Sequence, residues 1–280
     1  YLQKLLEVAA QLHPHTLPAL LAQQIFSHAD VPYRIRPYAA LLADSYNAIE
    51  FDWAHEEAVA ERVRTLGTDG KLALAAGGGV AHVSLAEKLL ILLLTKLGNL
   101  VPEGGIWMNT QRPEWNDANN ALVGKGLSVV TAAYLRRYIV FCRSLFAGQA
   151  APLRLTGEVN ALLTAVNSIL AGHQSALAAG FDDATRRAVM DALGAAAGDY
   201  RRRIYHTGFT GDFVDIAPAN VLALLDAALA YIDQTLRANR RSDGLYHAYN
   251  ILQLGAATAS VEPLYEMLEG QVAILSSGLL

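Results

Sequence analysis

Residues 106–124 gather the side chains that could bind and cleave a sugar. Aromatic rings stack on the apolar faces of sugar rings, while amide, guanidinium and carboxylate groups form directional hydrogen bonds with hydroxyls. Cleavage of a glycosidic bond needs a carboxylic acid that is protonated near neutral pH, and burial against an aromatic ring raises a carboxyl pKa. Glu114, beside Trp115 and close to the like charge of Asp117, fits this role. The candidates are Glu114 and Asp117 for catalysis, and Trp107, Asn109, Gln111, Arg112, Trp115, Asn116 and Asn119 for substrate binding.

The same segment also has a purely structural interpretation. Asn116, Asp117 or Asn119 could cap a following helix, with Trp115 in the core and Glu114 facing solvent. Residue types and spacing alone leave both interpretations open.

Three stretches resemble motifs of one enzyme family. Residues 114–135 resemble the D-W-N-D-G-x-N…G-x-G-x-S-V motif of the cellobiose and chitobiose phosphorylases, which belong to the six-hairpin (α/α)6 glycosidases. Residues 243–249 resemble their D-G-x-W-[FY]-x-R-A-[FY] motif, and residues 270–278 resemble their Q-x-W-A-[IV]-x-S-G motif. The resemblance covers about 107–280 and leaves 1–100 unmatched. The stretch 107–124 is also similar to one in very large bacterial proteins.

The resemblance implies inverting chemistry on an oligosaccharide or other glycoside. It gives the general-acid role to Glu114, which replaces the family's aspartate with a side chain one methylene longer. Trp115, Asn116 and Asp117 match residues that line the sugar site. Tyr246 and His247 fall in the second motif, where His247 followed by Ala248 replaces the family's arginine. The family's phosphate-binding residues lie beyond the third motif, so phosphorolysis with inorganic phosphate as co-substrate and hydrolysis both stay open.

Composition and charge exclude several other classes. The 22 basic and 26 acidic residues give a net charge of −4 with no basic run, which argues against nucleic-acid binding. Cys142 is the single cysteine, so no internal disulfide and no cysteine-based metal cage are expected. The histidines lack metal-ligand spacing, and we expect no metal or cofactor. The longest apolar run, 89–94, is too short for a bilayer, and no leader opens the chain, so we expect a soluble, cytoplasmic protein without a membrane partner.

The elements that must position these residues are mostly helices. Apolar periodicity predicts helices over 1–13, 16–28, 54–66, 84–99, 128–146, 157–171, 182–205 and 218–239, with a last one from about 260. Ser84 and Glu87 form a predicted capping box, and Ser128 is a predicted cap. Residues 29–53 are expected to form an ordered loop, and 77–79 a turn. The basic groups 201–203 and 240–241 are expected on solvated helix ends, where cations complement the helix dipole.

The sequence therefore predicts an all-α fold of about nine helices. Helices 84–99 and 128–146 are apolar all round and should be buried, whereas 54–66 and 182–205 should be half exposed. A buried layer surrounded by amphipathic helices is what a double ring requires, so we predict a partial (α/α)6 toroid. We expect an N-terminal helical and loop region over 1–83 and a partial (α/α)6 catalytic-like domain over 84–280.

Apolar patterns at both ends suggest a segment of a longer polypeptide, whose remainder would be a partner. An incomplete toroid lacks a closed site, so we expect the isolated chain to be inactive. Two other functions stay open: a non-catalytic helical domain that binds glycans or another chain, and a structural scaffold.

Overall fold

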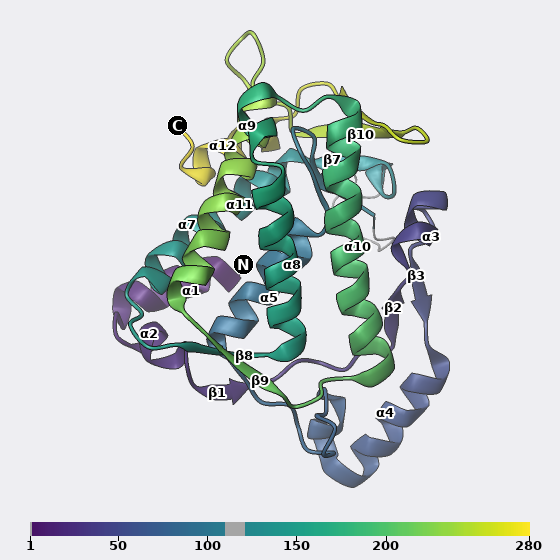
Figure 1. Cartoon of the computed structure of the whole chain (residues 1–280), viewed down its shortest axis with the longest axis vertical. Helices are drawn as coiled ribbons and strands as arrows, with labels where there is room; N and C mark the ends of the chain where they lie inside the picture. Colours follow the sequence, from purple (N-terminus) through teal and green to yellow (C-terminus); the bar gives the residue numbers. More distant parts are fainter. Residues whose placement is uncertain (1, 110–120) are drawn as a thin grey trace.

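The computed structural model describes residues 2–109 and 121–280, in which helices are the dominant elements (Figure 1). Five long helices form the centre: α5 (Leu85–Leu97), α7 (Val129–Ala147), α8 (Gly157–Gly172), α10 (Asp183–Thr207) and α11 (Pro218–Ala238). Figure 1 shows α11, α8 and α10 side by side in front of α5 and α7, and the two layers contact each other. Their shared core is a continuous cluster of buried aliphatic side chains.

The helices begin where the sequence places polar caps. Ser84 Oγ accepts a hydrogen bond from the Glu87 amide at 3.2 Å, and Ser128 Oγ accepts one from the Thr131 amide at 2.9 Å. The Glu87 carboxylate has a different partner from the one that a capping box predicts. It accepts from the Thr156 amide at 2.6 Å and from the Thr156 hydroxyl at 3.0 Å, so it joins the start of α5 to the start of α8.

A five-stranded antiparallel sheet lies at one end of the long helices and was not predicted. Its strand order is β11 (Ala259–Pro263), β10 (Tyr249–Leu254), β7 (Gly126–Ser128), β6 (Gly105–Trp107) and β5 (Leu100–Val101). Strand β5 follows α5, and β7 runs directly into α7. Three of the five strands have only two or three residues, too few to show an alternating pattern.

The chain is therefore helix-rich but not all-α. The helix predicted from about 260 is wrong, because β11 occupies that position and α12 (Leu268–Ser277) begins later. At the opposite end of the long helices, β8 (Leu153–Thr156) pairs with β9 (Phe213–Ile216). The short helix α9 (Ser175–Ala179) joins α8 to α10 at the end where the five-stranded sheet lies.

The N-terminal residues form short elements around this core. Helices α1 (Leu2–Leu12) and α4 (Trp53–Leu66) confirm two predictions. The helix predicted over 16–28 is shorter than expected: α2 (Thr16–Leu20) gives way to β1 (Gln24–Phe26), which pairs with β4 (Val83–Ser84). A 3-10 helix, η1 (Gly67–Lys71), follows α4.

The loop predicted over 29–53 is also wrong, since it contains regular structure. Strands β2 (Tyr33–Ile35) and β3 (Ile49–Phe51) pair antiparallel, with α3 (Tyr38–Ala43) between them. Pro37 directly precedes α3, where a missing amide donor costs no helical hydrogen bond. The proline therefore marks the start of a helix instead of excluding one.

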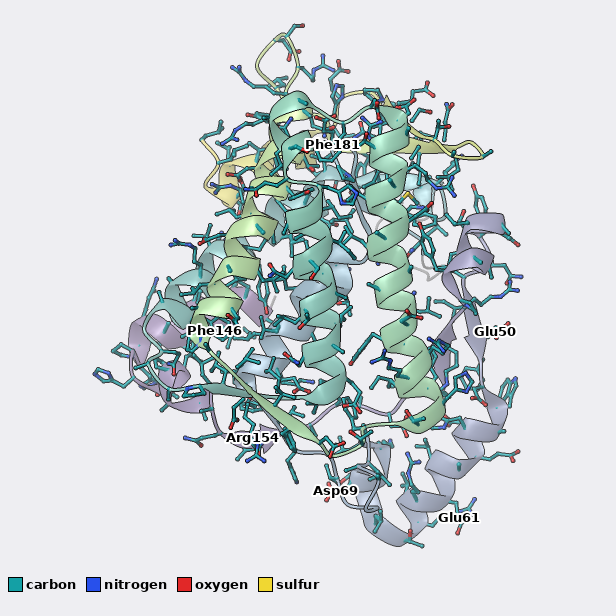
Figure 2. The ribbon with its side chains drawn as sticks, viewed as in Figure 1. Glu50, Glu61, Asp69, Phe146, Arg154 and Phe181 are labelled. Atoms are coloured by element: carbon teal, nitrogen blue, oxygen red, sulfur yellow. The ribbon has the colours of Figure 1, made fainter. Side chains whose placement is uncertain are left out.

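The predicted exposure of the helices holds only in part. α10 is half exposed as expected, whereas α5 exposes Leu92 at 44% and α7 exposes Val140 at 42%. Helix α4 buries only Val59, and Glu61 stands on its outer side (Figure 2). Within the described residues, no outer layer covers these sides of α5 and α7, so the helical layers do not confirm a closed double ring. None of the helices in 2–109 and 121–280 has the length and apolar surface needed to cross a membrane.

Candidate functional site

The two ends of the chemically rich segment lie together at the sheet. Trp107 is the last residue of β6, and the Met108 amide donates to the Gly126 carbonyl at 2.9 Å. The Gly124 amide donates back to the Met108 carbonyl at 2.6 Å. Residues 108–109 and 124–126 therefore lie together, and we call them the base of the segment.

Seven of the predicted site residues lie outside the described residues. Their roles stay predictions for Gln111, Arg112, Glu114, Trp115, Asn116, Asp117 and Asn119. The structure places the other four, Trp107, Asn109, Tyr246 and His247.

Trp107 is almost fully enclosed, with 3% of its surface exposed. Its indole N–H donates to the Gly124 carbonyl at 2.9 Å, and its ring belongs to a cluster that includes Leu41, Leu127 and Met190. A buried indole whose N–H is satisfied fixes the position of the backbone around it. Trp107 therefore holds the base of the segment, and its predicted stacking on a sugar stays a prediction.

A cavity of about 350 Å³ borders Trp107 and Asn109. Asn109 is buried, and its amide Nδ2 donates to Asn99 Oδ1 at 2.8 Å. Lys96, Asn99 and Thr131 add polar groups to the lining. Lys96 and Asn99 were not predicted as site residues, although both follow the leucine run of α5 and could have been recognised as its polar end.

Two glycines of the first motif are required by the backbone. Gly124 has a φ of 84°, and a Cβ there would lie 3.0 Å from Ser45 Oγ. A Cβ on Gly126 would lie 2.5 Å from Leu122 Cβ. The G-x-G spacing therefore lets the chain return to the sheet in close contact with its neighbours.

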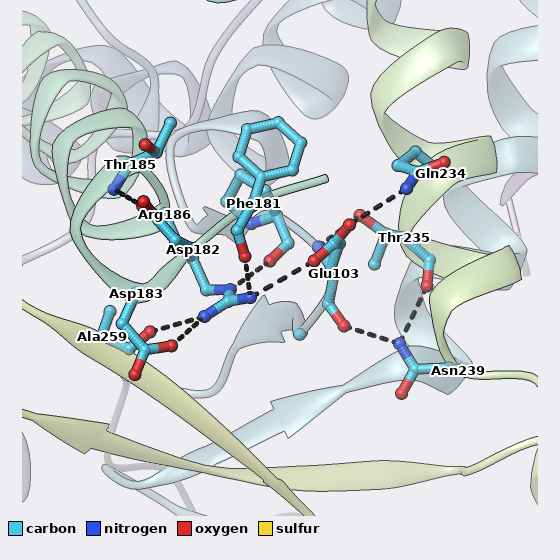
Figure 3. A network of polar contacts seen from close by, with 12 residues as sticks. Glu103, Phe181, Asp182, Asp183, Thr185, Arg186, Gln234, Thr235, Asn239 and Ala259 are labelled. Carbon is cyan, nitrogen blue, oxygen red and sulfur yellow. Dashed lines mark hydrogen bonds and ion pairs between the residues drawn. The ribbon is translucent and has the colours of Figure 1, made fainter. Parts of the chain in front are cut away.

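The turn that leads into β6 is held by a polar network (Figure 3). Glu103 follows Pro102 and has a φ of 61°, a left-handed conformation that is strained for glutamate. Its amide donates to Thr235 Oγ1 at 3.1 Å, its carbonyl accepts from Asn239 Nδ2 at 2.8 Å, and its carboxylate accepts from Gln234 Nε2 at 3.0 Å. Contacts from α11 and from its C-cap residue Asn239 to these three polar groups offset the strain.

Arg186 of α10 completes the network from the other side. Its side chain is buried and pairs with Glu103 at 3.3 Å and with Asp183 at 2.6 Å. Its guanidinium also donates to three backbone carbonyls, those of Pro102, Phe181 and Ala259, at 2.6–2.9 Å. One side chain thus ties α10, the turn before β6 and strand β11 together (Figure 3).

The second and third motif stretches contact each other and the first. Tyr249 of β10 pairs with Ser128 of β7. The Tyr246 amide donates to Gln271 Oε1 at 3.0 Å, and Gln271 Nε2 donates to the Tyr246 carbonyl at 2.7 Å. His247 Nδ1 lies 3.2 Å from a backbone carbonyl oxygen. The three stretches are therefore neighbours in space.

The structure does not bring all four placed candidates to one cavity. Tyr246 is 4% exposed, and neither its side chain nor that of His247 belongs to the described lining of the 350 Å³ cavity. Their predicted contact with substrate stays a prediction. Among the residues that the structure describes, no three His, Cys, Asp or Glu side chains form a group that could hold a metal ion.

No protein-family model matches the chain, and a search of curated proteins gives no match either.

Proposed function

We propose that this chain is the acid-bearing segment of a carbohydrate-active enzyme that cleaves a glycoside with inversion, by phosphorolysis or hydrolysis. The observation that carries the proposal is the contact among the three stretches that resemble the phosphorylase motifs. Strand β7 pairs with β10, and Gln271 exchanges two hydrogen bonds with Tyr246. Residues of one active site must be adjacent. The described residues of stretches 114–135, 243–249 and 270–278 are adjacent in this way.

The cavity beside Trp107 also supports the proposal. Its volume of about 350 Å³ falls within the range of small-molecule sites. Polar groups of Lys96, Asn99 and Asn109 border it, together with atoms of Trp107 and Met108. Hydrogen-bonding groups beside aromatic and apolar surface suit a sugar ring.

In the proposed reaction, Glu114 donates its proton to the glycosidic oxygen as the bond to the anomeric carbon breaks. Phosphate or water attacks the opposite face of that carbon, and the configuration inverts. Inorganic phosphate would be the co-substrate in phosphorolysis, and water would take its place in hydrolysis. We further propose that the two helical layers are part of an incomplete (α/α)6 toroid, and that the protein acts in the cytoplasm.

The test is a product assay with cellobiose and N,N′-diacetylchitobiose, with and without phosphate. It uses a polypeptide that contains this segment, because the isolated chain is predicted to be inactive. We expect turnover to fall about 100-fold or more in Glu114→Gln, since the general acid is removed. Glu57→Gln, an exposed carboxylate on α4, is the matched control and should retain full activity.

The products separate the mechanisms. A sugar 1-phosphate formed only with phosphate indicates phosphorolysis, and a free sugar formed without it indicates hydrolysis. Unchanged turnover in Glu114→Gln would remove this residue from the mechanism. Turnover by the isolated chain would contradict the prediction that it is inactive.

A second function is favoured by a different observation. Helix α1 exposes Leu5 at 68% and Val8 at 52%, and α12 exposes Leu268 at 79% and Leu275 at 73%. Arg137 hydrogen bonds to side chains of both helices. Apolar side chains gathered on two neighbouring helices are typical of a surface that binds another protein. A non-catalytic binding domain would release no product from either disaccharide and would leave Glu114→Gln indistinguishable from the wild type.

A further inference from the structure

A second cavity, of about 620 Å³, lies between the C-terminal half of α10 and the N-terminal elements β2, α3 and β3. Figure 1 shows these elements along the outer side of α10, and Glu50 marks this side of the molecule in Figure 2. Four arginines line the cavity: Arg34, Arg36, Arg201 and Arg202.

Three of these arginines are paired with carboxylates. Their N···O distances are 2.8–3.4 Å for the pairs Arg34 with Asp52, Arg36 with Glu50, and Arg202 with Asp199. Arg34 also lies over the ring of Tyr205, 4.7 Å from its centroid. The positive charge of each of these three arginines is therefore balanced inside the cavity.

Arg201 is the exception. Within the described residues its guanidinium makes no hydrogen bond and no ion pair, and its Nε is buried without a partner. Burial lowers the pKa of Arg201 below its usual value, but an arginine keeps its charge in proteins. With His206 counted as neutral, the four arginines and three carboxylates of the lining leave one positive charge uncompensated.

Arg201 is half-buried, and a cation that is partly removed from water is costly when it has no partner. An anion that enters the cavity would gain charge-assisted hydrogen bonds from Arg201 at a position partly shielded from water. The charge and the unsatisfied Nε therefore both indicate an oxyanion as the missing partner.

The walls of the cavity indicate the rest of the ligand. Ile35, Pro37 and the ring of Tyr205 present apolar surface, and the Tyr205 hydroxyl accepts a hydrogen bond from the Ile35 amide at 3.2 Å. Tyr38 closes the contact between α3 and α10, since its hydroxyl donates to Asp191 Oδ1 at 2.8 Å. A volume of this size exceeds what a bare inorganic anion needs.

We propose that this cavity binds a small organic oxyanion, with its phosphate or carboxylate group on Arg201 and its apolar or aromatic body against Ile35, Pro37 and Tyr205. The proposal is independent of the sugar-cleaving function, because Glu114 and the stretches around it do not enter the argument. Ile35 also borders the 350 Å³ cavity, so the two sites would be neighbours.

Isothermal titration calorimetry of the 280-residue chain at low salt tests the proposal. Phenyl phosphate and benzoate carry the two head groups on the same ring, and inorganic phosphate carries the head group alone. We expect phenyl phosphate or benzoate to bind more tightly than inorganic phosphate. Arg201→Gln should weaken that binding about tenfold or more, because it removes a charged donor from a half-buried site.

Two further variants keep the result interpretable. Arg203→Gln, at an exposed position on the same helix, should bind as the wild type does. Ala195→Glu places a carboxylate at an exposed helical position of the lining, where it should fold normally and abolish binding by competing with the ligand. The proposal is overturned if no probe binds the wild-type chain, or if Arg201→Gln and Ala195→Glu bind the probe as tightly as Arg203→Gln.

Discussion

Replacement of Arg186 by methionine tests how the turn before β6 is held. Methionine keeps the apolar stem of the side chain but removes every donor. Three carbonyls lose their hydrogen bonds, those of Pro102, Phe181 and Ala259. Glu103 loses a cation and keeps its bond from Gln234. Asp183 is half exposed and contributes little, because solvent screens that pair.

The contacts of Arg186 determine how much the free energy of unfolding should fall. A carbonyl left buried without a donor costs about 1 kcal/mol or more, so three of them cost about 3 kcal/mol. Removal of one partner from a buried ion pair costs about 3–5 kcal/mol when measured as a whole. The two counts overlap, since they describe the same guanidinium. We therefore expect Arg186→Met to lower the free energy of unfolding by about 3–5 kcal/mol.

Urea unfolding followed by far-ultraviolet circular dichroism measures this loss. Arg202→Met is the matched control on the same helix, because Arg202 and its partner Asp199 are 65% and 61% exposed. It should lower the free energy of unfolding by less than about 0.5 kcal/mol. If Arg186→Met comes within about 1 kcal/mol of the wild type, the network does not stabilise the turn and the reasoning fails.

Two further predictions follow from pKa shifts. Cys142 is buried, and burial raises the pKa of its thiol to about 12. Iodoacetamide at pH 8 should therefore label this thiol only after unfolding in urea. Rapid labelling of the native chain, measured by intact mass, would refute the placement of Cys142. The hydrogen bond from Arg137 lowers the pKa of Glu7 below its usual 4.5, so the stabilisation is complete above that pH and is lost as the pH falls through the lower folded value. When the pH is lowered, hydrogen exchange of the α1 amides should therefore become faster by more than the intrinsic pH effect. At pH 7 the exchange should already be faster in Glu7→Gln than in the wild type. Equal protection of both proteins at pH 7 would show that this pair does not hold α1.

The long helices could be predicted because each carries its own local signals. α5, α7, α8, α10 and α11 combine apolar periodicity with a polar cap or a proline at the start. The sheet could not be predicted in this way. Strands β5 and β6 are two and three residues long, and pairing partners distant in sequence determine them.

Residues of the sites could likewise be predicted where they stand together in the sequence, but not where a distant element supplies them. Trp107 and Asn109 were found because they stand in a stretch of unusual composition, whereas Lys96 and Asn99 reach the same cavity from another element. The basic group 201–203 looked like a solvated helix end. Arg202 and Arg203 are exposed and fit that interpretation, although Arg202 also borders the 620 Å³ cavity; Arg201 is half-buried in the wall of this cavity, so for this residue the prediction is wrong. Helix periodicity alone does not show which face of α10 the β2–β3 pair and α3 cover.

One face of α10 connects both proposed sites. Arg186, Met190, Gly194 and Arg201 recur at spacings of four and seven residues, which places them on the same side of the helix. Arg186 holds the turn before β6, and Met190 packs in the cluster around Trp107. A Cβ on Gly194 would lie 2.1 Å from the ring of Tyr38, so this glycine lets α3 approach α10 and form the cavity that Arg201 lines. The same side of α10 therefore packs against the turn before β6, the cluster around Trp107 and α3, and so supports elements that border both cavities.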